Sequence, residues 1–94
     1  MQIYIRKRAL NAIMKAAQFV ESKNTPGAGD RWADKLKREI IKFANAKVKL
    51  AICRNVSLTK FNYRCIVYKD WIIAYRISEN EFEVCRFIYA SRLK

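Results

Sequence analysis

The chain has 94 residues, 52% of them hydrophobic, and its 20 Lys and Arg outnumber 8 Asp and Glu to leave a formal net charge of +12. This length suits a single domain, residues 1–94, because a chain of about 100 residues has enough surface for only one core. No apolar run approaches the roughly 20 residues that span a bilayer, and the N-terminus lacks the apolar segment of a signal peptide, so we expect a cytoplasmic protein with no membrane partner.

The cysteines have no spacing that indicates a metal site. Cys53, Cys65 and Cys85 form no CxxC pair, and the chain has no histidine, so a zinc site would lack its usual ligands. Unpaired cysteine is among the most frequently buried residue types. We therefore expect three small buried thiols and predict neither a metal nor another cofactor.

The first half of the chain predicts a short strand followed by two helices. Gln2–Arg6 alternates in the manner of a strand, and helical spacing then runs over Ala9–Lys23. Asn24–Gly29 holds the only proline and both glycines, which indicates a loop. Asp30 is a favourable N-cap for a second helix that ends near Asn45 to Lys47. The apolar stripes of this antiparallel helical hairpin are Leu10, Ile13, Met14, Ala17 and Val20, then Trp32, Leu36, Ile40 and Phe43.

The last third of the chain predicts three antiparallel strands. Phe61–Tyr68, Trp71–Ile77 and Phe82–Ala90 are rich in aromatic and β-branched residues and are separated by polar turns. Val48–Lys60 is expected to be irregular. The predicted fold is α+β: a short N-terminal strand, a two-helix antiparallel hairpin and a three-stranded C-terminal antiparallel meander packed on the helices. The first strand is expected to add an edge to the meander.

Basic residues are concentrated in the middle of the sequence. No acid lies between Glu39 and Asp70, and a second basic cluster is Arg6-Lys7-Arg8. Such clusters favour an anionic partner such as nucleic acid, because neutralising phosphates releases counterions; the alternative is a solvated surface. The candidate target-binding or nucleic-acid-binding residues of the middle segment are Lys47, Lys49, Arg54 and Lys60.

Three motifs carry a family resemblance. Residues 71–77, WIIAYRI, contain a Tyr-Arg pair inside an apolar strand, residues 84–92, VCRFIYASR, contain two arginines around a tyrosine, and residues 61–64, FNYR, end in a further Tyr-Arg pair. These motifs resemble the RelE/ParE superfamily, the small toxins of bacterial type II toxin–antitoxin modules of the plasmid-stabilisation type. The resemblance implies the same fold, growth arrest by gyrase inhibition or by ribosome-dependent mRNA cleavage, and a cognate acidic antitoxin that covers the basic surface.

The resemblance also implies roles for single residues. Tyr89 and Ala90 stand where many relatives have His and Gly, which favours slightly a toxin that is not an enzyme. If the protein is an endoribonuclease, Arg86, Tyr89 and one of Arg64 or Lys69 would surround the scissile phosphate. Arginine would stabilise charge there, and Tyr89 or Lys69 would move a proton. Further residues expected to bind the target are Arg76 and Arg92.

Strand alternation makes a further prediction about the last strand. It assigns Val84, Arg86, Ile88 and Ala90 to one face and Cys85, Phe87 and Tyr89 to the other. An arginine among apolar neighbours must reach the rim of the sheet, pair with an acid or meet a partner's phosphate or carboxylate. Trp71 and Tyr75 are expected in the core, while Tyr63 and Tyr68 either pack there or stack on bases.

Three functional hypotheses remain open from the sequence. The first is a growth-arresting toxin, the second a basic nucleic-acid-binding module, and the third a degenerate, inactive toxin homologue that still binds an antitoxin. A small acidic reading frame beside the gene would favour the toxin over the module. Growth arrest on induction would separate the active toxin from the degenerate one.

Overall fold

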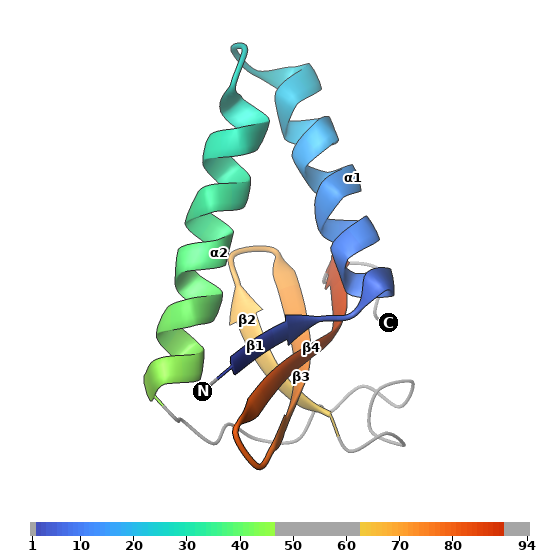
Figure 1. Ribbon diagram of the computed structural model, residues 1–94. Helices are drawn as coiled ribbons and strands as arrows, with labels where there is room; N and C mark the ends of the chain where they lie inside the picture. The colour runs from blue at the N-terminus through green and yellow to red at the C-terminus, as the bar shows by residue number, and fades with distance from the viewer. Residues whose placement is uncertain (1, 47–62, 90–94) are drawn as a thin grey trace.

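The computed structural model describes residues 2–46 and 63–89. The elements within them are β1 (Gln2–Ile5), α1 (Lys7–Lys23), α2 (Ala28–Ala46), β2 (Arg64–Tyr68), β3 (Trp71–Ser78) and β4 (Glu81–Tyr89). The two helices form an antiparallel hairpin that lies over one face of the sheet, which confirms the predicted α+β architecture (Figure 1). The predictions for the following residues fall outside the described ranges: Lys47, Val48–Lys60 with Lys49, Cys53 and Arg54, Phe61, Ala90 and Arg92.

The sheet has the order β1-β4-β3-β2. The three C-terminal strands pair antiparallel, and β1 pairs parallel with β4, with Ile3 opposite Phe82 and Ile5 opposite Val84. The N-terminal strand therefore adds an edge to the meander, as predicted. Ile3 and Ile5 both pack against the core cluster, because alternate side chains of a strand share one face.

A β-bulge interrupts the pairing of β3 with β4. Ala74 lies opposite Arg86, but the next residue, Tyr75, lies opposite Val84. Cys85 is therefore an extra residue on β4 with no partner on β3. A bulge of this kind reverses the alternation of side chains from that point along the strand.

The bulge changes which β4 side chains face the helices. Val84 and Phe87 both belong to the core cluster beneath the helices, whereas Cys85 packs with Ala74 in a second cluster. The register places Arg86 on the same face as Ala74. The predicted division, with Val84 and Arg86 on one face and Cys85 and Phe87 on the other, is wrong because strict alternation does not hold across a bulge.

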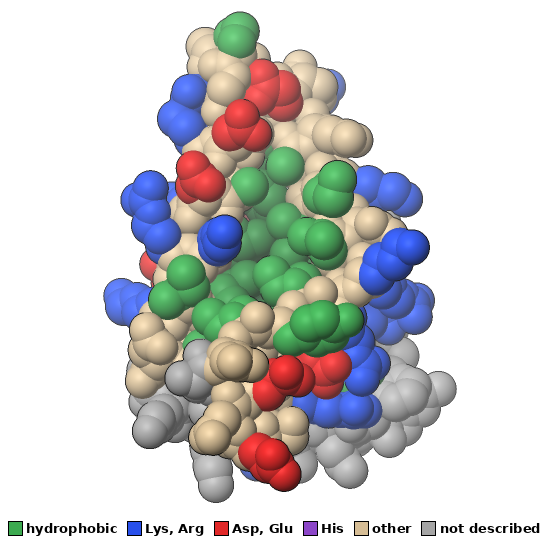
Figure 2. Space-filling view, viewed as in Figure 1, with side chains coloured by type: hydrophobic (Ala, Val, Ile, Leu, Met, Phe, Trp, Pro, Cys, Tyr) green, Lys and Arg blue, Asp and Glu red, His purple; other side chains and the backbone are tan. Residues whose placement is uncertain are grey.

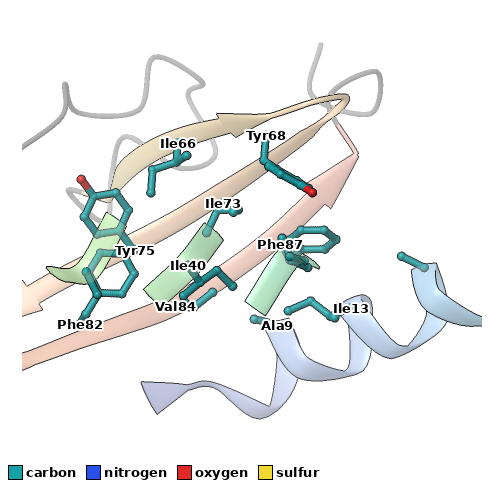
Figure 3. Close-up of a cluster of buried hydrophobic side chains, with 13 residues drawn as sticks. Ala9, Ile13, Ile40, Ile66, Tyr68, Ile73, Tyr75, Phe82, Val84 and Phe87 are labelled. Carbon is teal, nitrogen blue, oxygen red and sulfur yellow. The ribbon is translucent and has the colours of Figure 1, made fainter. Parts of the chain in front are cut away.

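The core lies between the helices and one face of the sheet. Tyr75 and Phe82 stack with ring centroids 4.6 Å apart, and Trp71 stacks on Phe87 at 4.5 Å. These contacts confirm that Trp71 and Tyr75 are packing residues. Tyr63 and Tyr68 are also buried. Figure 3 shows sheet residues projecting towards the helices; the buried cluster includes Ala9, Ile13, Ala16, Leu36, Ile40, Ala44, Ile66, Ile73 and Val84.

The start of α2 is organised by a residue of α1. The helix begins at Ala28, so Asp30 lies in its first turn and is not the N-cap that the sequence predicted. Glu21 takes this role: its carboxylate accepts hydrogen bonds of 2.8 Å from the N–H groups of both Gly27 and Gly29. These bonds lower the pKa of Glu21. A free N-terminal N–H group needs such an acceptor, which here comes from the preceding helix.

The helices approach closely where α2 begins. A Cβ atom on Gly29 would lie 2.5 Å from the carbonyl oxygen of Ala17, a backbone atom of α1. Only glycine fits this position without moving one helix. α1 begins at Lys7, two residues before the predicted start, and ends at Lys23 as predicted. Neither α1 nor α2 is long and apolar enough to cross a membrane.

The two cysteines within the described residues, Cys65 and Cys85, differ in their bonding. Cys85 is a buried free thiol, as expected. Cys65 is disulfide-bonded, so the expectation of a free thiol at this position is wrong. The sequence offered no signal for this bond, because it depends on which sulfur atoms the fold brings together.

Candidate functional site

The face of the sheet opposite the helices carries two arginines on neighbouring strands. Arg86 lies opposite the buried Ala74, and Arg76, two residues further along β3, lies opposite Glu83. Side chains two residues apart on a strand share a face, so Arg76 and Arg86 point to the same side. The structure thus brings together two of the arginines that the sequence singled out.

Tyr63 lies among these arginines. Its side chain is only 5% exposed and packs with Ala74 and Cys85. The guanidinium of Arg76 lies over its ring, 4.8 Å from the centroid. This distance is typical of a cation–π contact. Tyr63 is therefore a packing residue that holds Arg76 against this face.

An ion pair joins the two ends of the described chain on this face. Arg6 Nε donates to Glu83 Oε2 at 2.8 Å, and Arg6 Nη2 donates to Oε1 at 3.5 Å, across a sequence separation of 77. The hydrogen bond from Arg6 lowers the pKa of Glu83 and in turn raises that of Arg6. Sequence reasoning noted Arg6 only as part of a basic cluster, since no local signal identifies a partner so far along the chain.

Arg86 has a different environment from Arg6. Partial burial lowers the pKa of Arg86, the nearby charge of Arg8 lowers it further, and the proximity of Tyr63 raises it. Arg8 is exposed in the first turn of α1, a turn that contains no acid. Within residues 2–46 and 63–89, neither Arg8 nor Arg86 makes an ion pair or a hydrogen bond through its side chain.

Cys85, next to Arg86 on β4, is not a suitable nucleophile. Burial raises the pKa of its thiol above the ordinary value of 9.0, with a further contribution from Glu83. A neutral thiol at physiological pH is a poor nucleophile, because the thiolate is the reactive form. Its Sγ lies 3.7 Å from both the backbone oxygen and Oε1 of Glu83.

The other predicted catalytic residues lie elsewhere. Arg64 is opposite Tyr75 in the register, and Tyr89 is opposite Trp71, so both occupy the helix side of the sheet. The ring of Tyr89 contacts that of Trp71 at a centroid distance of 5.1 Å. These positions do not bring Arg64 or Tyr89 together with Arg86.

Lys69 lies in the turn between β2 and β3. Its backbone has a positive φ of 53°, and its Nζ lies 5.6 Å from the centroid of the Tyr68 ring. The ring of Tyr68 belongs to the core cluster on the helix side of the sheet. Lys69 is therefore also separated from the face that carries Arg76 and Arg86.

The helix side of the molecule presents a hydrophobic surface. Figure 2 shows apolar side chains gathered between α1 and α2, with basic residues along the outer sides of the helices. The exposed apolar helix residues include Leu10 and Met14 on α1 and Ile41 on α2. Each of them directly follows a buried residue in the sequence. They widen the apolar stripes beyond what the core covers.

A family comparison identifies the chain. The model for the family described as ParE toxin of type II toxin-antitoxin system, parDE, matches residues 3–93. This range includes every described residue except Gln2, and so covers the helical hairpin and the arginine-bearing face together. A search of curated protein sequences gave no significant match. The element order and the family match agree, and the chain belongs to the ParE toxin family of type II toxin–antitoxin systems.

Proposed function

We propose that this toxin arrests bacterial growth by binding and inhibiting DNA gyrase, without cleaving mRNA, and that a cognate acidic antitoxin neutralises it. Membership of the family implies an antitoxin partner. The target and the mode of neutralisation are the proposed parts. The alternatives are ribosome-dependent mRNA cleavage, a nucleic-acid-binding module and an inactive homologue.

The observation that carries the choice of gyrase is the separation of Arg86 from Tyr89. The register puts Arg86 on the face with Ala74 and Tyr89 on the face with Trp71. General acid–base catalysis needs the proton-transferring group and the charge-stabilising group within hydrogen-bond reach of one reacting phosphate. Side chains on opposite faces of a sheet do not meet this condition. The chain also lacks histidine, the commonest proton-transferring residue.

A toxin that acts by binding needs a surface complementary to its target. Arg76 and Arg86 lie on one face, and the whole chain carries a net charge of +12. Such a surface favours an acidic protein surface or DNA, and gyrase works with DNA bound to it. The geometry therefore supports inhibition by binding better than catalysis.

The proposed antitoxin segment is acidic and amphipathic. Its apolar side chains would cover Leu10, Met14 and Ile41, and its acids would pair with the basic residues that flank the helices in Figure 2. Burying apolar side chains supplies affinity, and charge complementarity supplies specificity and a fast association rate. We expect tight binding that weakens as salt is added.

Expression in a bacterial host tests the proposed function. The toxin is induced with and without the neighbouring acidic reading frame, and the same cells supply plasmid-topology gels and primer extension on a reporter mRNA. Arrest with altered supercoiling and intact mRNA is the expected result, and co-expression of the antitoxin should restore growth. New mRNA ends inside codons would make the protein a ribosome-dependent ribonuclease instead, and absence of arrest would leave the binding module or the inactive homologue.

A further inference from the structure

The outer side of α2 carries a stripe of four basic side chains. Arg31, Lys35, Arg38 and Lys42 are all exposed and recur at intervals of one helical turn. Because each residue of an α-helix turns by about 100°, these side chains lie within about 60° of one another around the helix axis. They extend over about 16 Å along the axis, since each residue rises about 1.5 Å. We call them the α2 basic stripe.

The α2 basic stripe lies opposite the buried side of the helix. Leu36, Ile40 and Ala44 belong to the core cluster, and helical spacing places them on the far side of the axis from the stripe. Figure 2 shows basic side chains along this outer side of α2. No other residue between Arg31 and Lys42 falls within the same arc. The arc therefore contains neither an apolar nor an acidic side chain.

The acids of the chain leave the stripe charged. All 8 Asp and Glu lie within the described residues, and among those residues no ion pair joins an acid to the stripe. Asp34 and Glu39, the acids that flank the stripe on its two sides, are included in this statement. Arg31 donates a hydrogen bond of 3.2 Å to Thr25 Oγ1, a neutral acceptor that does not balance its charge.

We propose that the α2 basic stripe binds the phosphate backbone of duplex DNA, so that the toxin contacts the DNA held by gyrase as well as the enzyme. This inference rests on the proposed function and deepens it by naming DNA as a direct ligand. One strand of a duplex presents a phosphate about every 3.4 Å of its axis, so a stripe of about 16 Å faces roughly five of them. The helix fixes the spacing of the cations before they bind.

The composition of the stripe favours phosphates over an acidic protein surface. Protein interfaces are centred on apolar and aromatic side chains, and lysine is depleted there. Contacts to a phosphate backbone come instead mainly from Arg and Lys. The stripe consists of two Lys and two Arg, and the exposed apolar residue Ile41 lies outside its arc.

The aromatic residues of α2 do not favour single-stranded nucleic acid. Recognition of unpaired bases depends on exposed aromatic rings on which the bases stack. The aromatic residues of α2 are Trp32 and Phe43, and both pack against the core cluster. The helix thus offers cations for a backbone and no ring for a base, which suits a double helix whose bases are already paired.

Fluorescence anisotropy with a labelled DNA duplex of arbitrary sequence, titrated at several salt concentrations, tests the site. Lys35→Ala and Lys42→Ala are each expected to weaken binding roughly tenfold at about 0.1 M salt. Each should also reduce the slope of log affinity against log salt by about one, and the double variant by about two. Lys35→Arg should retain the slope, because the charge remains.

Lys37→Ala is the matched control. Lys37 is exposed on the same helix, and helical spacing turns it about 100° or more away from every member of the stripe. Its loss removes the same charge and should leave the affinity and slope close to those of wild type. Alanine is the strongest helix former, so these variants should fold, which thermal unfolding checks. Arg38→Ala serves if one of the lysine variants does not fold.

Five results would overturn the inference. They are a wild-type toxin that does not bind the duplex, an equal effect of Lys37→Ala and Lys35→Ala, an unchanged salt slope in the double variant, tighter binding of single-stranded RNA of equal length, and a double variant that loses binding to DNA-free gyrase but keeps its duplex affinity. The last would assign the stripe to a protein surface.

A gyrase supercoiling assay on the same protein separates this inference from the proposed function. Gyrase inhibition without duplex binding defeats the DNA site alone. Duplex binding that depends on Lys35 and Lys42, without gyrase inhibition, defeats the proposed function alone.

Discussion

Arg6 and Glu83 form a two-point ion pair that ties the junction of β1 and α1 to the first half of β4. The shorter bond, from Arg6 Nε to Glu83 Oε2, is 2.8 Å long, and the carboxylate side is less exposed than the guanidinium side, at 19% against 41%. β1 contributes only four residues to the sheet. The pair therefore reinforces the attachment of a short edge strand.

Glu83→Gln should make the stability of the protein less dependent on pH. The pKa of Glu83 is lowered below 4.5 in the folded protein, so its contribution is complete above about pH 4.5 and is lost as the pH falls through the folded pKa. Because the pair is partly exposed, we expect the variant to lose about 1 kcal/mol at most at pH 7 and nothing at pH values below the folded pKa. Urea unfolding across this pH range measures the difference.

Glu79→Gln is the control for this change, because Glu79 is an exposed acid in the turn between β3 and β4. It should leave the pH dependence close to that of wild type. An equal loss for Glu83→Gln at acidic and neutral pH would show that the amide disturbs packing and that the ion pair is not the cause.

Gly29→Ala should destabilise the helical hairpin by about 2 kcal/mol, because its Cβ would lie 2.5 Å from a backbone oxygen of α1 that cannot move independently. Gly27→Ala is the informative comparison. There the nearest atom belongs to the flexible side chain of Arg31, and the cost is mainly that of a left-handed backbone at φ 88°, about 1 kcal/mol. Thermal unfolding of both variants tests whether Gly29→Ala loses more stability than Gly27→Ala. A Gly29→Ala protein as stable as wild type would contradict the close approach of Gly29 to the backbone of α1.

Tyr68→Phe should stabilise the protein by up to about 1 kcal/mol. Within the described residues, the hydroxyl of Tyr68 is buried and has no hydrogen-bond partner, so its removal saves the cost of desolvating a polar group. Tyr4→Phe, at a side chain 51% exposed, should change little. Chemical denaturation measures both, and a marked loss of stability in Tyr68→Phe would reveal a partner for this hydroxyl.

Tyr89→Phe should leave growth arrest intact if the toxin works by binding. The ring contact with Trp71 survives the change, and the hydroxyl lies on the opposite side of the sheet from Arg86. Arg86→Ala should weaken arrest, because it removes a cation from the proposed target-binding face. Growth curves after induction provide the measurement, with expression levels checked by immunoblot. Loss of arrest in a folded Tyr89→Phe protein would favour a catalytic role for the phenol.

Met14→Glu should weaken antitoxin binding at least tenfold, because it places an acid on the apolar helix surface that the acidic antitoxin would cover. Phe19→Glu tests the specificity of this effect. Phe19 is 64% exposed on the same helix, and its position five residues along turns it to a different side. Calorimetric titration with the purified antitoxin compares the two, and equal losses would argue against the side of α1 that carries Met14 as the docking site.

Local patterns in the sequence were sufficient to predict much of the fold. The end of α1 at Lys23, the start of β3 at Trp71 and the alternation of Ile3 and Ile5 in β1 all follow from periodicity and turn residues, which depend on near neighbours. The cap of α2 was missed, because Glu21 reaches Gly27 and Gly29 from the preceding helix and replaces the expected Asp30.

By itself, the sequence determined the class of fold, the order of its elements, its basic character and the motifs that suggested a toxin family, since each is written in local spacing or in composition. The tertiary structure decided which side chains meet. One extra residue at Cys85 separates Arg86 from Val84 and places Val84 on the same face as Phe87, and the ion pair between Arg6 and Glu83 joins residues 77 positions apart. Strand register and long-range contacts result from the packing of the whole chain, so the composition of the arginine-bearing face became visible only in the fold.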